Sequence, residues 1–202
     1  NERLNIVQPT QAQLHKLSKM YYSHLADGAI EVIKLFQQLN KTLFIISAGN
    51  NPAVSLLGER LGIPKAHCFA VDLYFDSDGN YRDFDRESLL IKRMGKNAIL
   101  QNIKNQYGSV LHIGDGMNDL EAKEVPTRFV GYGGTFQNTN VAQQSPFYFN
   151  SPSLLPLIPL SLTQQEVETL NSDNMKLYNQ GVNLLEQHLT INPQEHYNDI
   201  IR

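Results

Sequence analysis

The residues with the clearest chemical potential lie in one short acidic string, Gly114-Asp115-Gly116-Met117-Asn118-Asp119. Its two carboxylates stand four residues apart and directly follow the apolar run 110–113. Hard cations such as Mg²⁺ prefer carboxylate and water oxygens, and glycines let a backbone approach a ligand closely. Two glycines and two acids at the end of a buried strand serve no obvious packing purpose. The string therefore predicts a metal-binding loop.

Two further groups could act beside this loop. Ser47 follows the apolar run 42–46, where a turn of small residues would offer a hydroxyl and backbone N–H groups to an anion. Lys96 lies between the two strands in sequence, near the start of a predicted helix. Each has an ordinary alternative, Ser47 as a turn residue and Lys96 as a solvated surface lysine. Together, a hydroxyl, a lysine and an acidic loop are the groups needed to hold a phosphoryl group.

Strand and helix patterns alternate along the chain, which predicts a doubly wound, Rossmann-like parallel sheet of the α/β class. The predicted strands are 42–46, 68–71, 110–113, 128–130 and 147–149, the predicted helices are 11–39 (broken at Gly28), 52–61 and 87–107, and a hairpin is predicted over 73–84. Ligands of such sheets bind at the carboxyl ends of the strands, so Ser47 and Asp115 should serve one pocket.

Composition limits the class of protein. The 202 residues are 41% hydrophobic with a net charge of −3, from 17 Lys plus Arg and 20 Asp plus Glu. This composition excludes extensive disorder, argues against broad nucleic-acid binding, and includes no run of about 18 apolar residues suited to a membrane helix. Cys68 is the one cysteine, so no intrachain disulfide forms, and the first residues do not resemble a signal peptide. We therefore expect a cytoplasmic protein without nucleic-acid or membrane partners.

At this point the motifs resemble a known family. The segments 43–49, Gly95-Lys96 and 114–122 resemble motifs II, III and IV of the haloacid dehalogenase superfamily, in particular its phosphoserine phosphatase branch. The resemblance begins at Glu2-Arg3-Leu4 and continues to about Leu155. It implies a partial helical cap over 1–26 and a haloacid dehalogenase-like α/β core over 27–160 that lacks its first strand. Beyond Pro159 the sequence becomes rich in amides and helical in pattern, which predicts a helical appendage over 161–202. We expect the helices 164–170 and 174–189 to form either that appendage or a homodimer contact.

The resemblance also implies a reaction on a small phosphorylated metabolite. An aspartate on the first strand attacks phosphorus to form an aspartyl-phosphate, a second aspartate two residues later protonates the leaving group, and Mg²⁺ bridges carboxylate and phosphate. Carried over, Ser47 and the N–H of Gly49 would hold phosphate oxygens, and Lys96 would neutralise the nucleophile and the phosphoryl charge. This assignment agrees with phosphoryl transfer being mostly positioning and charge neutralisation.

The remaining roles concern the metal and the rest of the substrate. By the same resemblance, Asp115 and Asp119 would serve the Mg²⁺ site, Asn118 would support the metal site and the substrate, and Arg3 would grip the substrate carboxylate. Two departures weaken the choice of phosphoserine itself: Asn50 stands where the branch usually has a larger residue, and Val71-Asp72 replaces an asparagine-arginine pair. A small phosphomonoester is therefore the safer expectation.

Motif I of the family, an Asp-x-Asp that carries the nucleophile, has no match before Ser47. The acids in that region are Glu2, Asp27 and Glu31, none with the required spacing. The string Asp76-Ser77-Asp78-Gly79 has the right form but follows motif II, and Asp-Gly-Asn is a common turn. We therefore expect the nucleophile and general acid to be missing from this chain. Since losing a covalent nucleophile costs on the order of 10⁶ in rate, the chain alone should be nearly inactive.

Two other interpretations use the same residues. A non-catalytic phospholigand-binding or scaffolding protein could have lost the first strand, in which case another chain or the C-terminal helices must cover the neighbouring strand edges. A receiver-like signalling module is a weaker third interpretation, because it would need an acidic cluster before the first helix. The reading frame upstream of Asn1 distinguishes the first of these from the enzyme.

Overall fold

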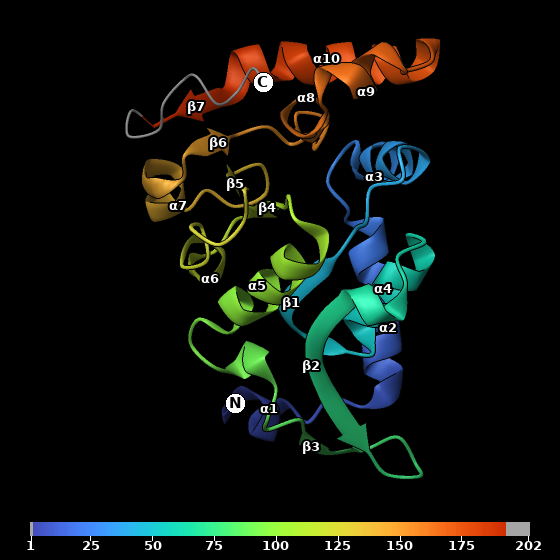
Figure 1. The fold of residues 1–202 in the computed structure, drawn as a ribbon. Helices are drawn as coiled ribbons and strands as arrows, with labels where there is room; N and C mark the ends of the chain where they lie inside the picture. The colour runs from blue at the N-terminus through green and yellow to red at the C-terminus, as the bar shows by residue number, and fades with distance from the viewer. Residues whose placement is uncertain (1, 193–202) are drawn as a thin grey trace. The chain divides into compact units, whose positions relative to one another are not determined.

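The computed structural model describes residues 2–192, with side chains from Leu4 onward (Figure 1). The chain folds into two compact units. Unit 1 comprises 1–25 and 42–96, and unit 2 comprises 26–41 and 97–202. Strands and helices alternate in both, as the α/β prediction requires, but the strands form two separate sheets.

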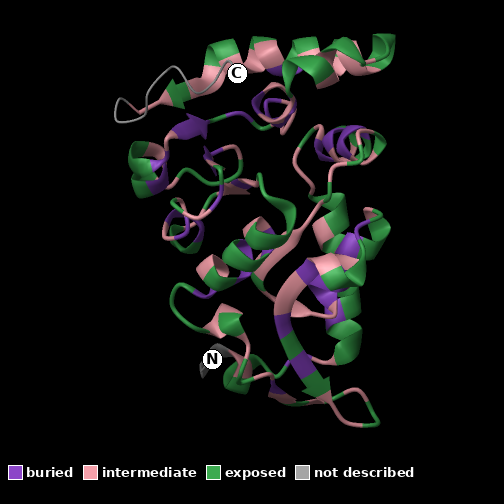
Figure 2. Cartoon of the chain, in the orientation of Figure 1, coloured by how far each residue is buried: buried purple, intermediate pink, exposed green. Residues whose placement is uncertain are grey.

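Unit 1 is built on a three-stranded sheet in the order β1-β2-β3. β1 (Ile45–Asn51) runs parallel to β2 (Cys68–Phe75), and β3 (Tyr81–Phe84) returns antiparallel to β2. Figure 2 shows buried and exposed positions alternating along the distal half of β2, the pattern of a strand with one solvated face. The other elements of this unit are α1 (Glu2–Val7), α2 (Gln11–Ser23), α4 (Ala53–Arg60), η1 (Lys65–His67) and η2 (Leu89–Ile91).

The core of unit 1 joins residues distant in sequence, namely Leu14, Ala53, Val71, Leu73 and Phe84. α2 is fixed at its start by a capping box, in which Thr10 Oγ1 accepts from Gln13 N at 3.2 Å and Gln13 Oε1 accepts from Thr10 N at 2.8 Å. The sheet and α2 thus share one apolar interior.

The β2–β3 hairpin settles the interpretation of the Asp76 string. The Asp76 carboxylate accepts from the backbone N–H groups of Asp78 at 2.9 Å and Asn80 at 2.8 Å, and Gly79 has φ +80°. These bonds, chiefly the one from Asn80, lower the pKa of Asp76. The carboxylate is used to close a turn, which confirms the hairpin prediction.

Unit 2 contains a four-stranded sheet in the order β4-β5-β6-β7. β4 (Leu111–Gly114), β5 (Arg128–Tyr132) and β6 (Phe147–Phe149) are mutually parallel, and β7 (Leu189–Ile191) pairs antiparallel with β6. All three residues of β6 are buried, as expected for a strand covered on both faces. The helices of unit 2 are α3 (Ala29–Gln38), α5 (Gly95–Tyr107), α6 (Met117–Leu120), α7 (Thr139–Gln144), α8 (Leu157–Ser161), α9 (Gln164–Glu168) and α10 (Ser172–His188). The first two residues of α5 belong to unit 1 and the rest of this helix to unit 2.

Several predicted boundaries are wrong. The strand predicted over 42–46 begins at Ile45 and continues to Asn51, and the helix predicted over 87–107 begins at Gly95 after the short helix η2. Met94 has φ +57°, a left-handed conformation that interrupts a helix there. The strands predicted over 68–71, 110–113 and 128–130 are also longer or shifted, whereas 147–149 is confirmed.

The C-terminal segment is part of unit 2. Figure 1 shows α10 beside β7 and α8, and Gly181 of α10 approaches so closely that a Cβ there would lie 2.4 Å from the Leu155 carbonyl oxygen. Asn174 of α10 donates to Gln38 of α3 at 2.9 Å. The predicted three-part division and the homodimer contact stay predictions. None of the helices in the described part of the chain combines the length and apolar character needed to span a membrane.

An ion pair also holds this segment, and it predicts a pH-dependent stability. Lys41 Nζ lies 2.6 Å from Glu166 Oε1, and both side chains are about three-quarters buried. Burial opposes ionisation, but the hydrogen bonds from Lys41 and Thr163 outweigh it and lower the pKa of Glu166. A carboxyl whose pKa is lower in the folded state than in the unfolded state stabilises the fold fully when the pH is above its unfolded-state pKa. This stabilisation is lost as the pH falls through the folded-state pKa.

We therefore expect Glu166→Gln to lower the free energy of unfolding at pH 7 by about 1 kcal/mol. The difference from the wild type should shrink as pH falls below the ordinary glutamate range. Urea unfolding at pH 7 and pH 3.5 measures both values, and Glu168→Gln, on the exposed side of the same helix, is the control. An equal loss at both pH values would contradict the role of this pair.

Candidate functional site

Ser47 lies in an irregular part of β1. Ile46 is in register with Phe69 and Asn50 with Val71, so four residues of β1 span two of β2. The segment 47–49 therefore leaves the ladder and its backbone groups become available for other uses. This bulge explains why the chain continues as a strand to Asn51 where a turn was predicted.

The predicted phosphate ligands Ser47 and Gly49 are brought together here. The N–H of Gly49 donates to Ser47 Oγ at 3.0 Å, and a Cβ at Gly49 would lie 3.1 Å from the same oxygen. The hydroxyl and the amide thus lie in contact. An incoming anion would have to replace the Ser47 hydroxyl as the acceptor of the hydrogen bond from the Gly49 N–H. Their role in phosphate binding stays a prediction.

Asn51 fixes the end of this segment. Its Nδ2 donates to Asp72 Oδ1 at 2.9 Å across the sheet, and its Oδ1 accepts from Ser55 N at 3.1 Å in the first turn of α4. One side chain thus ties β1 to β2 and to the following helix. Sequence reasoning missed Asn51, although its place directly after the small-residue turn was a usable signal.

Lys96 is the second residue of α5 and is half-buried. The start of this helix is tightly packed, because a Cβ at Gly95 would lie 1.7 Å from the Leu89 carbonyl oxygen of η2. Further along the same helix, Asn97 Nδ2 donates to Glu121 O at 3.3 Å and Lys104 Nζ donates to Val125 O at 2.8 Å. α5 is therefore bound to the segment that follows α6.

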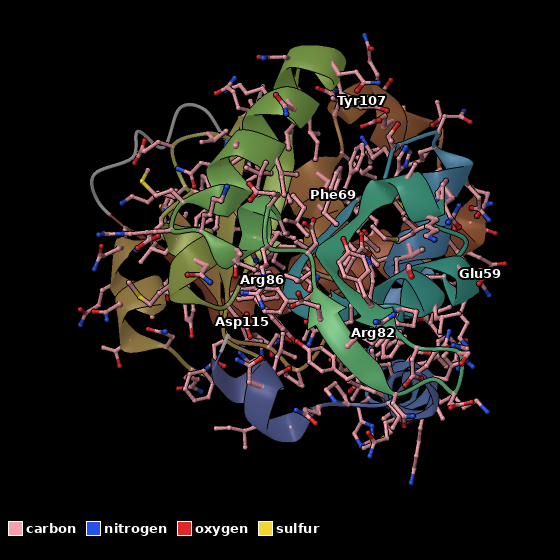
Figure 3. The ribbon with its side chains drawn as sticks, turned by 90° about the horizontal axis from the view of Figure 1, so that it is seen from below. Glu59, Phe69, Arg82, Arg86, Tyr107 and Asp115 are labelled. Carbon is pink, nitrogen blue, oxygen red and sulfur yellow. The ribbon has the colours of Figure 1, made fainter. Side chains whose placement is uncertain are left out.

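The acidic string lies at the carboxyl end of β4, as predicted. Gly114 ends the strand, Asp115 and Gly116 form the bend, and Asn118 and Asp119 lie on α6. Asp115, labelled in Figure 3, is exposed, and Asn118 is exposed as well. Unit 2 thus presents one carboxylate and one amide at the edge of its parallel strands, where α/β proteins bind ligands.

Asp119 differs from Asp115 in being buried, with 6% of its surface exposed. Its Oδ1 lies 3.0 Å from His112 Nε2, and its Oδ2 accepts from Gly116 N at 3.3 Å. One oxygen of this carboxylate is therefore bonded to strand β4 and the other to the bend after it. Sequence reasoning missed His112, although a histidine within an apolar strand was a usable signal.

Gly114 must be glycine because of this side chain. A Cβ at Gly114 would lie 2.2 Å from both Cβ and Cγ of Asp119. We expect Gly114→Ala to lower the free energy of unfolding by about 1–3 kcal/mol, since the buried carboxylate would have to move. Gly116→Ala is the matched control, because its Cβ would lie 3.5 Å from Asp119 Oδ2 in ordinary contact. Chemical denaturation measures both, and equal losses would contradict the steric argument.

Tyr132, at the end of β5, belongs to the same edge of unit 2. Burial raises the pKa of its hydroxyl, and the charges of Asp27 and Asp115 raise that pKa further. The hydroxyl donates to the Pro152 carbonyl oxygen at 3.3 Å. No local pattern indicated that Tyr132 would lie near the acidic loop, because its position depends on how β5 pairs with β4.

The donors of unit 2 fit part of a Mg²⁺ site. Mg²⁺ is typically held by one or two carboxylates with several waters, and Asp115 offers such a carboxylate on a glycine-flanked bend. Within residues 4–192, no cluster of three His, Cys, Asp or Glu side chains suits a metal ion. Asp115 would thus fit as one ligand of a Mg²⁺ ion, which would need further donors besides it.

The predicted residues fall into two groups. Ser47, Gly49 and Lys96 belong to unit 1, whereas Asp115, Asn118 and Asp119 belong to unit 2. Within unit 1, Ser47 and Gly49 lie in contact. Within unit 2, the residues of the acidic string lie close together. The side chain of Arg3 lies outside the described residues.

Comparisons with known proteins agree on one family. A family model described as a haloacid dehalogenase-like hydrolase matches residues 10–123. Human phosphoserine phosphatase is 30% identical over 149 residues, which cover 73% of this chain and 66% of the human protein. Phosphoserine phosphatase of Drosophila melanogaster is 28% identical over 149 residues, covering 72% of this chain and 55% of that protein. The chain thus spans at most about two thirds of these relatives.

A solved structure shows the same fold. The crystal structure of a phosphoserine phosphohydrolase-like protein from Francisella tularensis superposes with a TM-score of 0.69 at 25% identity, covering 80% of this chain and 74% of that one. The similarity extends beyond the segment matched by the family model. The predicted Rossmann-like α/β fold class is confirmed.

Proposed function

The chain belongs to the haloacid dehalogenase-like hydrolase family, within its phosphoserine phosphatase-like branch, and from that premise we propose that it is part of a Mg²⁺-dependent phosphatase of small phosphomonoesters. The observation that carries the proposal is the loop after β4. Asp115 is exposed there, while Asp119 is buried and both of its oxygens are engaged. The exposed, glycine-flanked carboxylate of Asp115 is suited to bind one metal ion and, through it, a phosphorylated ligand.

The residues of this chain would divide the work as follows. Asp115, with support from Asn118 and Asp119, would hold Mg²⁺, which supplies charge neutralisation at the phosphate. Lys96 would add a positive charge, and the Ser47 hydroxyl and the Gly49 amide would donate hydrogen bonds that orient the phosphate oxygens. These groups position the ester and disperse charge, which accounts for most of the catalysis in phosphoryl transfer.

The covalent step needs residues beyond these. We propose that the first aspartate of an Asp-x-Asp preceding Asn1 in the complete protein attacks phosphorus as the P–O ester bond breaks, and that the second aspartate protonates the leaving oxygen. Water would then release inorganic phosphate and restore the first carboxylate. The relatives support this proposal, because human phosphoserine phosphatase is longer than the matched segment. The strand edges support it too, since among residues 2–192 β1 pairs with β2 alone and β4 with β5 alone. Each sheet can accept another strand.

The first experiment is a panel of phosphorylated small molecules tested with the product of the complete reading frame. We expect Mg²⁺-dependent phosphate release, with phosphoserine among the substrates because the curated relatives carry that name. Release that is unaffected by chelation of divalent cations would overturn the metal assignment. Binding of phosphoserine without release would favour the non-catalytic interpretation.

Arg3 provides the test of the substrate class. If Arg3 contacts a substrate carboxylate, Arg3→Ala should raise KM for phosphoserine about tenfold or more, since a charged hydrogen bond is lost. KM for a phosphomonoester without a carboxylate, such as ethyl phosphate, should change little. Steady-state kinetics on both substrates measure the contrast, with Arg93→Ala, on the exposed segment before α5, as the control. Equal effects on both substrates would remove the reason for naming a phosphorylated amino acid.

A further inference from the structure

His112 of β4 and Asp119, the last residue of the acidic string, form a buried pair. Nε2 of His112 lies 3.0 Å from Oδ1 of Asp119, with 10% and 9% of the two side chains exposed. Because an ionised carboxylate only accepts hydrogen bonds, the Nε2–H of His112 is the donor. The pair joins the middle of β4 to the third residue of α6.

The ring of His112 packs against an aromatic side chain of the neighbouring strand. His112 is in register with Phe129 of β5, and the two ring centroids are 5.8 Å apart. Leu120 and Phe129 are each at most 4% exposed. Burying a histidine and a carboxylate is costly, and an apolar side chain often stabilises such a position better. Packing alone therefore gives no reason for His112.

The bonding of Asp119 supplies a reason. While Oδ1 is held by His112, Oδ2 accepts the N–H of Gly116, and Gly114 leaves space for the carboxylate that a Cβ would fill. The same side chain thus bonds to the backbone directly after Asp115 and packs against Gly114 directly before it. Loss of the His112 donor removes one of the hydrogen bonds that orient this carboxylate, and its bond to Gly116 would weaken.

We propose that His112 is a positioning residue: its hydrogen bond to Asp119 fixes the bend that carries Asp115. The effect of this on Mg²⁺ binding rests on the function proposed above, whereas the effect on the bend does not. Partners of this kind, bonded to a residue of a metal site, typically contribute about 10–100-fold to metal affinity. His112 touches neither substrate nor metal in this proposal.

Two substitutions of His112 introduce the same amide group on side chains of different length, so they test whether the donor reaches Asp119. A glutamine amide nitrogen can occupy the place of the histidine Nε2, so His112→Gln should keep the donor. The asparagine side chain is one carbon shorter, so His112→Asn should lose the donor. Amide hydrogen exchange at Gly116, followed by NMR on the full chain, reports the bend itself. We expect exchange about tenfold faster in His112→Asn and close to wild type in His112→Gln, with the amides of β6 as controls.

The outcomes are distinct. Faster exchange at Gly116 in His112→Asn with unchanged β6 supports the proposal. Unchanged exchange at Gly116, or equal acceleration by both substitutions, overturns it, as does acceleration at Gly116 no greater than at β6. If His112→Asn does not fold, His112→Gln alone decides: accelerated exchange at Gly116 overturns the proposal, and wild-type exchange supports it.

A second measurement connects the bend to the metal. In the complete protein, the Mg²⁺ concentration for half-maximal activity should rise about tenfold in His112→Asn and return towards wild type in His112→Gln. A fall in kcat with no change in this concentration would overturn the effect on the metal. If the wild-type protein hydrolyses no phosphomonoester, the proposed function fails, and exchange at Gly116 still decides the role of His112.

Discussion

Lys96→Ala in the complete protein should lower kcat/KM for a phosphomonoester by about 10²–10³-fold or more. Such a loss is typical when a group that stabilises developing charge is removed. Lys96 lies in the first turn of α5, whose start packs tightly against η2 and whose later residues are bonded to the segment after α6. The ammonium is thus carried on a fixed element, and alanine should remove the charge without moving the helix.

The matched control is Lys92→Ala, four residues earlier. Lys92 is exposed and lies 3.7 Å from Glu87 in a surface ion pair, which contributes little. We expect kcat/KM of this variant to equal that of the wild type. Full activity of Lys96→Ala, with unchanged thermal stability, would refute the role of Lys96 in neutralising charge.

Asp115→Asn should weaken Mg²⁺-dependent turnover in the complete protein by a comparable factor. The amide retains the shape of the side chain but removes the negative charge, and hard cations bind carboxylates in preference to amides. Because Asp115 is exposed, the substitution should leave the free energy of unfolding nearly unchanged. Calorimetric titration with Mg²⁺ gives a measure of the metal that is independent of activity, and we expect its affinity to fall about tenfold or more.

Asp76→Asn is the control for this experiment. Asp76 stands in the one Asp-x-Asp-Gly string of the chain, but its carboxylate closes the β2–β3 turn. Turnover and Mg²⁺ affinity should therefore match the wild type. Loss of activity in Asp76→Asn would mean that the turn assignment misses a catalytic role, and full activity of Asp115→Asn would refute the metal assignment.

The sequence was sufficient where a local pattern determines the structure. The triplet 147–149 forms β6 at the predicted residues, because a continuous run of large aromatic side chains favours a strand that is covered on both faces. The acidic string lies at the carboxyl end of a strand because the glycines permit the bend and the run before them pairs in the sheet. The family assignment followed from the same string and is confirmed.

Features that depend on tertiary pairing escaped prediction. β1 passes through a bulge and continues to Asn51, whose side chain bonds to Asp72 of the neighbouring strand, 21 residues later in the chain. β7 exists because its backbone completes β6, and no alternation of side chains announces so short a strand. The role of His112 could not be predicted from the sequence, because its partner Asp119 lies on α6 and is brought next to it by the fold.

One comparison tests the central proposal most directly: phosphate release from phosphoserine by the product of the complete reading frame and by the 202-residue chain, each with Mg²⁺ and with a chelator. We expect the complete product to turn over only with Mg²⁺. The shorter chain should be slower by about 10⁶-fold, because it has no Asp-x-Asp ahead of Ser47 to supply a nucleophile. Equal rates from both proteins, or no hydrolysis of any phosphomonoester by the complete one, would contradict the account.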